Sequence, residues 1–197
     1  MKTVGLLVFP GVEPIEAFTC IDVLSRASAK TTIISVFDSS EVLTAHNISI
    51  NPQTSLSSIS DSFFDLVILP GGPGSLQTTL NTNPLLHAFL KNHVDNNKLV
   101  CAICAAPITL CNAGLLTEHS ATSYPATREA VEPNCKSYYL DKVVISRNII
   151  TSRGPGTSLL CALVLVGLVY SPNVAESIAK AMLLCDEDLQ ILKSIIV

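Results

Sequence analysis

The feature that most constrains the fold is an apolar segment, residues 98–107, which leads into Cys104 and then into a helical pattern that begins at Pro107. A nucleophile on a sharp strand-to-helix turn needs small neighbours two positions before and after it, because the backbone there is crowded. Ala102 and Ala106 occupy those positions. The segment therefore predicts a nucleophile elbow. The start of the following helix is expected to lower the pKa of the Cys104 thiol and to favour a thiolate.

The other cysteines are interpreted as ordinary residues, because free cysteine commonly packs as a small hydrophobic side chain. We expect core positions for the four that lie in apolar helical patterns, Cys20, Cys111, Cys161 and Cys185. Cys101 and Cys104 form a C-x-x-C spacing, but it lacks the second pair or the placement of a zinc or thioredoxin motif. The sequence therefore predicts no metal site. Seven cysteines without a recognisable signal peptide indicate reduced thiols in the cytoplasm.

Length and composition favour one large core. A chain of 197 residues with 48% hydrophobic content most simply forms a single domain over residues 1–197. A net charge of -4 leaves no basic surface for a nucleic acid. The most apolar run, residues 159–170, is shorter than the roughly 20 residues of a membrane span. It predicts a buried helix in which Gly167 packs closely against a neighbouring element, and neither a nucleic acid nor a membrane is expected as a partner.

The order of segments predicts an α/β sandwich with a mostly parallel central sheet, because strand and helix patterns alternate. Continuous apolar runs predict strands at residues 4–9, 31–37, 66–69 and 99–103. Helical patterns with Pro near the first turn lie at residues 14–29, 84–96 and 107–113. Residues 142–145 and 149–151 predict an added hairpin, and the serine-rich residues 51–61 predict a surface connection.

The strand ends bring several chemically useful residues together. The carboxyl ends of parallel strands meet at one edge of the sheet, and ligands bind in the crevice outside it. Four loops then gather around Cys104. One carries Glu16, which its apolar neighbours predict to be partly buried with a raised pKa. A glycine-rich loop offers the backbone N–H groups of Gly71 and Gly72, and the last loop delivers Arg153.

Two alternatives remain open for these loops. On its own, Glu16 is more typical of a solvated residue, or of a partner of the helix dipole, in the first turn of a helix. The sequence Pro70-Gly-Gly-Pro-Gly74 is equally typical of a plain tight turn. It lacks the lysine of a phosphate-binding loop, and no G-x-G-x-x-G follows a strand, so nucleotide binding is disfavoured.

Four segments together carry a resemblance that covers most of the chain: residues 12–16, 67–72, 102–107 and 150–158. The chain resembles the DJ-one/ThiJ/PfpI superfamily, most closely its small DJ-one branch. The resemblance implies a flavodoxin-like three-layer α/β/α sandwich, commonly a homodimer, that works without a cofactor. It also implies one of several activities: glutathione-independent glyoxalase, deglycase, oxidative-stress sensor or chaperone.

The resemblance also implies roles for individual residues. Cys104 would be the nucleophile and the oxidation-sensitive thiol, and Glu16 its hydrogen-bonding acid/base partner. Backbone N–H groups of Gly72 and Ala105 would form the oxyanion hole.

The chain departs from the family at Tyr124, where relatives commonly place a histidine before the proline. A tyrosine hydroxyl can donate a hydrogen bond, but with a reference pKa of about 10 it does not act as a base at neutral pH. His46 aligns approximately with an arginine that lines the site entrance in relatives, and is interpreted either as a substrate contact or as a surface histidine. Tyr124, His46, Gly71 and Arg153 are therefore the candidate substrate-binding residues.

Three functions follow from these residues. The first is a cofactor-independent enzyme that acts on small reactive carbonyl compounds such as methylglyoxal, with Cys104 adding to the aldehyde carbon. The second is a non-enzymatic oxidative-stress sensor or chaperone, in which Cys104 is oxidised to a sulfinic acid. The third, a cysteine peptidase or amidotransferase-like hydrolase, is disfavoured because such enzymes need a histidine acting on the thiol.

Overall fold

A seven-stranded sheet forms the centre of the computed structural model, which describes residues 1–196. The strands lie in the order β10-β11-β7-β6-β1-β2-β5. All neighbours pair in parallel except β10 and β11, which form an antiparallel hairpin. The strands span Thr3–Val8 (β1), Lys30–Ser35 (β2), Thr54–Ser55 (β5), Leu66–Leu69 (β6), Leu99–Ile103 (β7), Val143–Ser146 (β10) and Ile149–Ser152 (β11).

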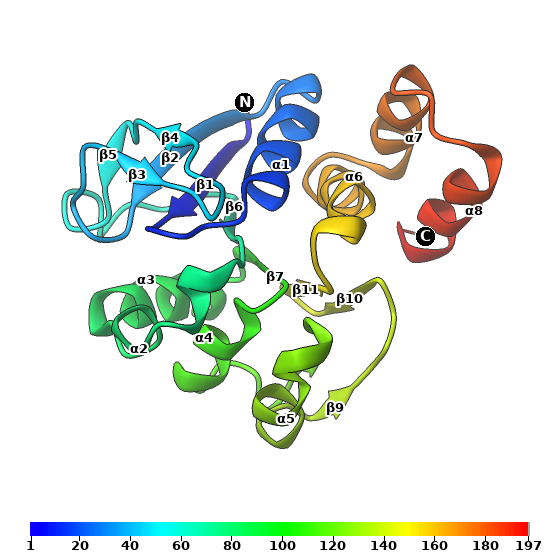
Figure 1. The fold of residues 1–197 in the computed structure, drawn as a ribbon. Coiled ribbons are helices and arrows are strands. Elements are labelled where there is room, and N and C mark those ends of the chain that lie inside the picture. Colours follow the sequence, from blue (N-terminus) through cyan, green and yellow to red (C-terminus); the bar gives the residue numbers. More distant parts are fainter. Residues whose placement is uncertain (197) are drawn as a thin grey trace.

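Helices cover both faces of this sheet and make three layers (Figure 1). One face carries α1 and α6, with α7 and α8 packed against α6: their bounds are Pro14–Arg26, Ser158–Val169, Pro172–Ala181 and Asp186–Ile196. The opposite face carries α3 and α4, with the short helices α2 and α5 beside α4: their bounds are Pro84–Asp95, Pro107–Asn112, Thr78–Asn81 and Arg128–Val131. The predicted α/β/α sandwich is therefore confirmed.

Short elements complete the loops around the sheet. Two small strand pairs stand apart from it, β3 (Val42–Leu43) with β4 (Ser49–Ile50) and β8 (Ser120–Ala121) with β9 (Ser137–Tyr138). Four 3-10 turns are Pro73–Leu76 (η1), Pro125–Thr127 (η2), Glu132–Asn134 (η3) and Pro155–Thr157 (η4). Within residues 1–196, no helix combines the length and the apolar character needed to cross a bilayer.

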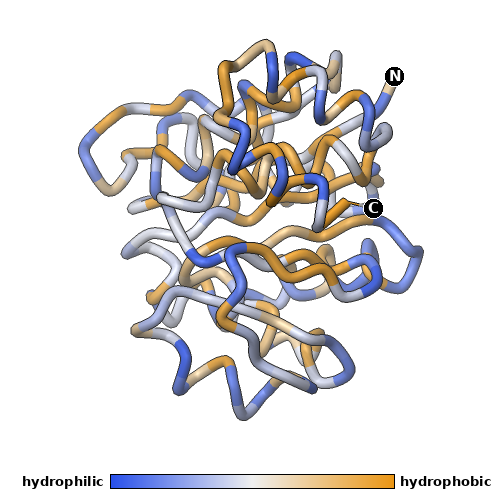
Figure 2. Tube along the Cα trace, turned by 90° about the vertical axis from the view of Figure 1, so that its right-hand side faces the viewer, coloured by the Kyte–Doolittle hydropathy of each residue, from blue (hydrophilic) through white to orange (hydrophobic). Residues whose placement is uncertain are grey.

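The inner strands are apolar because both of their faces are covered. Every residue of β6 is buried, and β7 is buried from Val100 onward. Figure 2 shows hydrophobic segments gathered in the interior of the molecule and hydrophilic positions along the outer loops. Helix α6 is apolar around most of its circumference, since the sheet, α1, α7 and α8 surround it.

The predicted strands and helices are confirmed with small shifts at their ends, but the predicted surface connection at residues 51–61 is partly wrong, because Thr54–Ser55 form β5 at the edge of the sheet. Helix α1 stops at Arg26 instead of residue 29, because Ser28 adopts a positive φ of 62° and β2 begins at Lys30. The core prediction is confirmed for Cys20 and Cys161, which are fully buried, whereas Cys111 is only half-buried.

The prediction of a core position is wrong for Cys185. This residue is exposed, and its sulfur contacts Asp188 Oδ2 at 3.3 Å. It lies just before the first turn of α8, between the apolar Leu183 and Leu184 and three acidic residues, and its side chain is open to solvent.

Close helix packing explains the glycine in α6. A Cβ atom on Gly167 would lie 3.1 Å from Cγ2 of Ile196 in α8, which is tighter than most real contacts. The predicted close approach at Gly167 is therefore confirmed, and α8 is the element that approaches.

Gly167→Val should lower the free energy of unfolding by about 1–3 kcal/mol, because added methyl groups in a close-packed contact force α8 away from α6. Urea unfolding followed by circular dichroism measures the change. Gly156→Val is the matched control, since no atom lies within 4 Å of its Cβ position, and it should stay within about 0.5 kcal/mol of the wild type. Equal effects at the two positions would contradict the packing argument.

Candidate active site

Cys104 stands at the end of β7 in a strained backbone conformation, with φ of 63°. Such a left-handed conformation costs a non-glycine residue about 1–3 kcal/mol and persists only where the surroundings enforce it. The Cys104 N–H donates to the carbonyl of Ser152 at 2.9 Å, and its own carbonyl accepts from the Tyr124 N–H at 2.8 Å. Strand β11 and the Tyr124 segment thus hold the turn, and the predicted nucleophile elbow is present.

The glycine loop after β6 fits tightly against this elbow. A Cβ atom on Gly71 would lie 2.6 Å from Cβ of Cys104. Any residue other than glycine at this position would therefore displace the elbow. Gly72 has a positive φ of 108°, and its Cβ would collide with the carbonyl oxygen of Gly11. The loop therefore needs glycine for close backbone approach to the thiol and to the loop after β1.

Glu16 is fully buried at the start of α1 and points toward the same place. Its Oε2 accepts a hydrogen bond from the Gly71 N–H at 2.6 Å. The other oxygen, Oε1, is buried with no close hydrogen-bond partner in residues 1–196. Burial raises the pKa of Glu16 to about 7, against the opposing effects of the Gly71 N–H and the Cys104 side chain. The predicted increase in the pKa of Glu16 is confirmed.

The expected decrease in the pKa of Cys104 is wrong. Burial, followed by the charge of Glu16 and by the interaction of its side chain with the thiol, raises the pKa of Cys104 to about 12. The backbone N–H groups of Gly72 and Ala105 interact with the sulfur and act in the opposite direction, but they do not dominate. Helix α4 has only six residues, so its dipole is weak compared with the neighbouring carboxylate. Cys104 is therefore a thiol at neutral pH while Glu16 is close to half ionised.

A cavity of about 370 Å³ opens onto the sulfur, which keeps Cys104 8% exposed. Its lining comprises Glu13, Gly72, Pro73, Leu76, Cys104, Ala105, Tyr124, Ala126, Thr127 and Pro155. Tyr124 is a wall of this cavity. The Tyr124 ring and the Cys104 sulfur lie 3.5 and 3.8 Å from the point where a Cβ on Gly154 would stand. The sulfur can thus be reached from solvent, beside an aromatic ring.

Of the predicted site residues, Cys104, Glu16, Gly71, Gly72 and Ala105 come together around the thiol. Among the substrate-contact candidates, Tyr124 alone lines the cavity.

The other three substrate-contact candidates are not among the residues that line the cavity. Gly71 lies behind the sulfur and donates to Glu16. Arg153 donates to the carbonyl of Leu140 at 2.8 Å, away from the lining. His46 is also outside the lining, with its Nε2 3.5 Å from Oε2 of Glu13, so its role as a substrate contact stays a prediction.

Sequence reasoning missed Glu13, which both lines the cavity and caps α1 by accepting from the Ile15 N–H at 3.3 Å. Its place directly before Pro14 is the available signal, because a carboxylate preceding a proline at a helix start is typical of an N-cap. Leu76 and Ala126 were also missed, since they belong to short 3-10 segments without a hydrophobic period.

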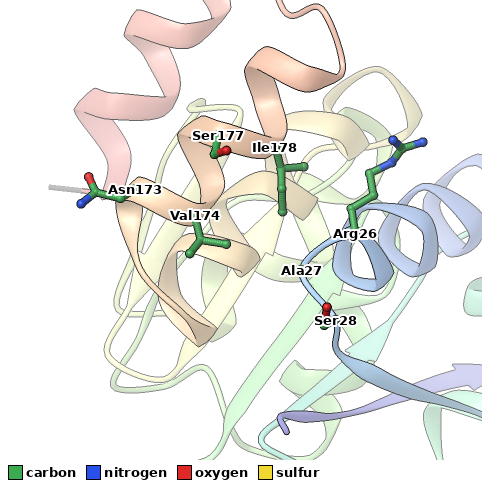
Figure 3. A pocket seen from close by; sticks show the side chains of 7 residues that line it. All are labelled: Arg26, Ala27, Ser28, Asn173, Val174, Ser177 and Ile178. Carbon is green, nitrogen blue, oxygen red and sulfur yellow. The ribbon is translucent and has the colours of Figure 1, made fainter.

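A second cavity, of about 380 Å³, lies between the end of α1 and α7 (Figure 3). Its one charged lining residue, Arg26, points away from Val174 and is paired with Asp22 at 2.8 Å. Among the described residues, its lining contains no cysteine and no carboxyl side chain. Within residues 1–196, no group of three or more His, Cys, Asp or Glu side chains could hold a metal ion.

The comparison with protein families matches residues 2–167 to the DJ-1/PfpI family. The chain belongs to the DJ-1/PfpI family. The matched region contains the elbow, Glu16 and the whole sheet, whereas α7 and α8 lie beyond it.

Individual relatives agree with this assignment. The chain is 37% identical to Protein DJ-1 homolog A of Arabidopsis thaliana over 93% of its own length, although it spans about half (47%) of that longer protein. It is 34% identical to the glutathione-independent glyoxalase DJR-1.2 of Caenorhabditis elegans, covering 87% of this chain and 90% of the relative. The crystal structure of Drosophila melanogaster DJ-1beta superimposes with a TM-score of 0.87 at 34% identity, over 93% of this chain and 98% of that one.

The raised pKa of Glu16 predicts a specific dependence of stability on pH. The folded protein holds the Glu16 proton more tightly than the unfolded chain, so the contribution of Glu16 to stability is complete below pH 4.5 and is lost as the pH rises through about 7. The decrease should approach about 3 kcal/mol in the free energy of unfolding. Urea unfolding between pH 4 and 8 measures it.

Glu16→Gln isolates this contribution, because an amide has no proton to lose while other titrating groups remain. The difference in unfolding free energy between the wild type and Glu16→Gln should therefore change across the same pH window. A difference that is constant from pH 4 to 8 would show that the carboxyl group is not held protonated in the folded protein.

Proposed function

We propose that this chain is a cofactor-independent, cysteine-dependent enzyme of the glyoxalase or deglycase type, acting on methylglyoxal-like dicarbonyls or their adducts. The observation that carries the proposal is a buried carboxyl group whose pKa is raised to about 7, next to a thiol that is reachable from a cavity. General acid/base catalysis is most effective when the pKa of the catalytic group lies near the working pH. The name of the Caenorhabditis elegans relative supports the same chemistry.

The raised pKa of Cys104 determines how the first step proceeds. Since the sulfur is protonated at neutral pH, attack on the aldehyde carbon requires the thiol proton to move to ionised Glu16 as the S–C bond forms. The π electrons of the aldehyde move to its oxygen. Backbone N–H groups of Gly72 and Ala105, which already interact with the sulfur, lie where they can stabilise that oxyanion.

The remaining steps reuse the same carboxyl group. Glu16 returns its proton to the oxyanion, giving a hemithioacetal, and then removes the proton from the former aldehyde carbon. Delivery of that proton to the adjacent carbonyl carbon, while the hydroxyl proton of the hemithioacetal passes to the oxygen of that carbonyl, gives the thioester of a 2-hydroxy acid. Water cleaves the S–C bond and restores the thiol. The sum is a 2-oxoaldehyde plus water giving a 2-hydroxy acid, with no external oxidant or reductant.

Tyr124 changes the family arrangement without adding a base. Its hydroxyl can donate a hydrogen bond to the substrate's second carbonyl, while proton transfer stays with Glu16. This assignment suits a site in which the buried carboxyl group next to the thiol, Glu16, already has a pKa near neutrality.

The first test is turnover of methylglyoxal to lactate by the purified chain without glutathione. Cys104→Ser should abolish turnover, because the nucleophilic sulfur is lost. Glu16→Gln should lower kcat/KM by about 10²- to 10⁴-fold, the usual contribution of a general acid/base.

Cys185→Ser provides the control, since this thiol is exposed and lies outside the cavity lining, and it should keep the wild-type rate. Equal turnover by the wild type, Cys104→Ser and Glu16→Gln would end the proposal.

A second candidate function is a sensor in which peroxide oxidises Cys104 to a sulfinic acid. Two molecules of hydrogen peroxide are reduced to water as the sulfur gains two oxygen atoms. Glu16 favours this candidate, because below about pH 7 it can donate a hydrogen bond to a sulfinate oxygen, and its Oε1 is otherwise without a close partner.

Mild peroxide followed by peptide mass spectrometry distinguishes this role. A sensor should gain two oxygen atoms at Cys104 before the exposed Cys185 is modified, and Glu16→Gln should shift the product toward further oxidation. Oxidation that begins at Cys185, or spreads evenly over the seven cysteines, would argue against a sensor.

A further inference from the structure

The cavity at Cys104 has apolar walls. Five of its lining residues present hydrocarbon or aromatic surface, namely Pro73, Leu76, Tyr124, Ala126 and Pro155. Leu76 and Tyr124 are 59% and 45% exposed, so two large apolar side chains remain uncovered at the site. A ligand that covers them gains free energy in proportion to the apolar area removed from water.

The cavity is also larger than the smallest dicarbonyls require. Methylglyoxal has five non-hydrogen atoms and occupies about the volume of three water molecules, roughly 90 Å³. The cavity measures about 370 Å³. With the aldehyde carbon at the sulfur, the remaining space along Leu76 and Tyr124 can take a substituent of the size of a phenyl ring.

Charge restricts the substituent further. Glu13 is the one charged residue of the lining, and its side chain is only 11% exposed. No Lys or Arg lines the cavity, and the hydroxyl of Thr127 already donates to the carbonyl of Tyr124 at 2.8 Å. An anionic substituent would lose its hydration and face the Glu13 carboxylate without a cationic partner. His46 at 3.5 Å from Glu13 offsets this repulsion only when it is protonated.

We propose that the site selects neutral 2-oxoaldehydes with an apolar, above all aromatic, substituent, and that Leu76 and Tyr124 bind that substituent while Glu13 rejects anionic ones. This inference rests on the proposed glyoxalase chemistry and names its substrate class. The reacting end of the substrate is unchanged, so the product is the corresponding 2-hydroxy acid, mandelate in the case of phenylglyoxal.

Initial rates on three substrates test the selection: methylglyoxal, phenylglyoxal and 4-carboxyphenylglyoxal. The value of kcat/KM for phenylglyoxal should exceed that for methylglyoxal by at least about tenfold, the lower range for added groups in an apolar pocket. The carboxylated ring, which has the same shape plus one negative charge, should be at least about tenfold poorer than phenylglyoxal.

Two variants test which side chains produce the substrate preference. Leu76→Ala should lower the ratio of phenylglyoxal to methylglyoxal kcat/KM several-fold, whereas Leu183→Ala, 89% exposed and outside the lining, should leave that ratio unchanged. Glu13→Gln keeps an oxygen that can cap α1, and should raise the ratio of 4-carboxyphenylglyoxal to phenylglyoxal kcat/KM.

The possible failures are distinguishable. Turnover in which methylglyoxal is at least as good a substrate as phenylglyoxal, or in which the carboxylated ring equals the neutral one, would overturn the selectivity and leave the proposed function standing. No turnover of any of the three substrates would remove the proposed function and the selectivity together.

Discussion

The hydrogen bond from the Gly71 N–H to Glu16 joins the two parts of the molecule on which the site depends. Its 2.6 Å length ties the first turn of α1 to the loop after β6, and the same loop fits against the elbow so tightly that Gly71 has no room for a side chain. Parallel strands bring both loops to one edge of the sheet, but they do not by themselves fix the distance between a carboxyl group and a thiol. That distance depends on this one buried contact and on the strained φ of Cys104.

The same contact determines the chemistry of the thiol. A carboxylate next to a buried sulfur disfavours a second negative charge, so the thiol keeps its proton at neutral pH. In the mechanism proposed above, reactivity belongs to Glu16 and Cys104 together, because the carboxyl group ionises near neutrality and can accept the thiol proton. Under that proposal Glu16 supplies the base at the nucleophile, and Tyr124 need not do so.

Much of this site could be predicted from the sequence, because its parts obey local rules. Small residues around Cys104, glycines after a buried strand and a carboxylate at a helix start all have a backbone reason, and parallel topology places them together. The raised pKa of Cys104 could not be predicted, since it depends on burial and on the proximity of Glu16. Leu76 and Ala126 escaped prediction because 3-10 turns lack a hydrophobic period. Cys185 was placed wrongly because it lies in the connection before α8, not within a helix, and is followed directly by three acidic residues.

The distribution of the other sulfurs has a practical consequence. Cys20, Cys101 and Cys161 are fully buried between the sheet, α1 and α6, and the sulfurs of Cys101 and Cys161 are 3.7 Å apart. A bulky thiol reagent can reach these three only when the layer of helices separates from the strands, while Cys185 is open at all times. The rate at which these buried thiols are labelled therefore measures how often the core opens by local unfolding.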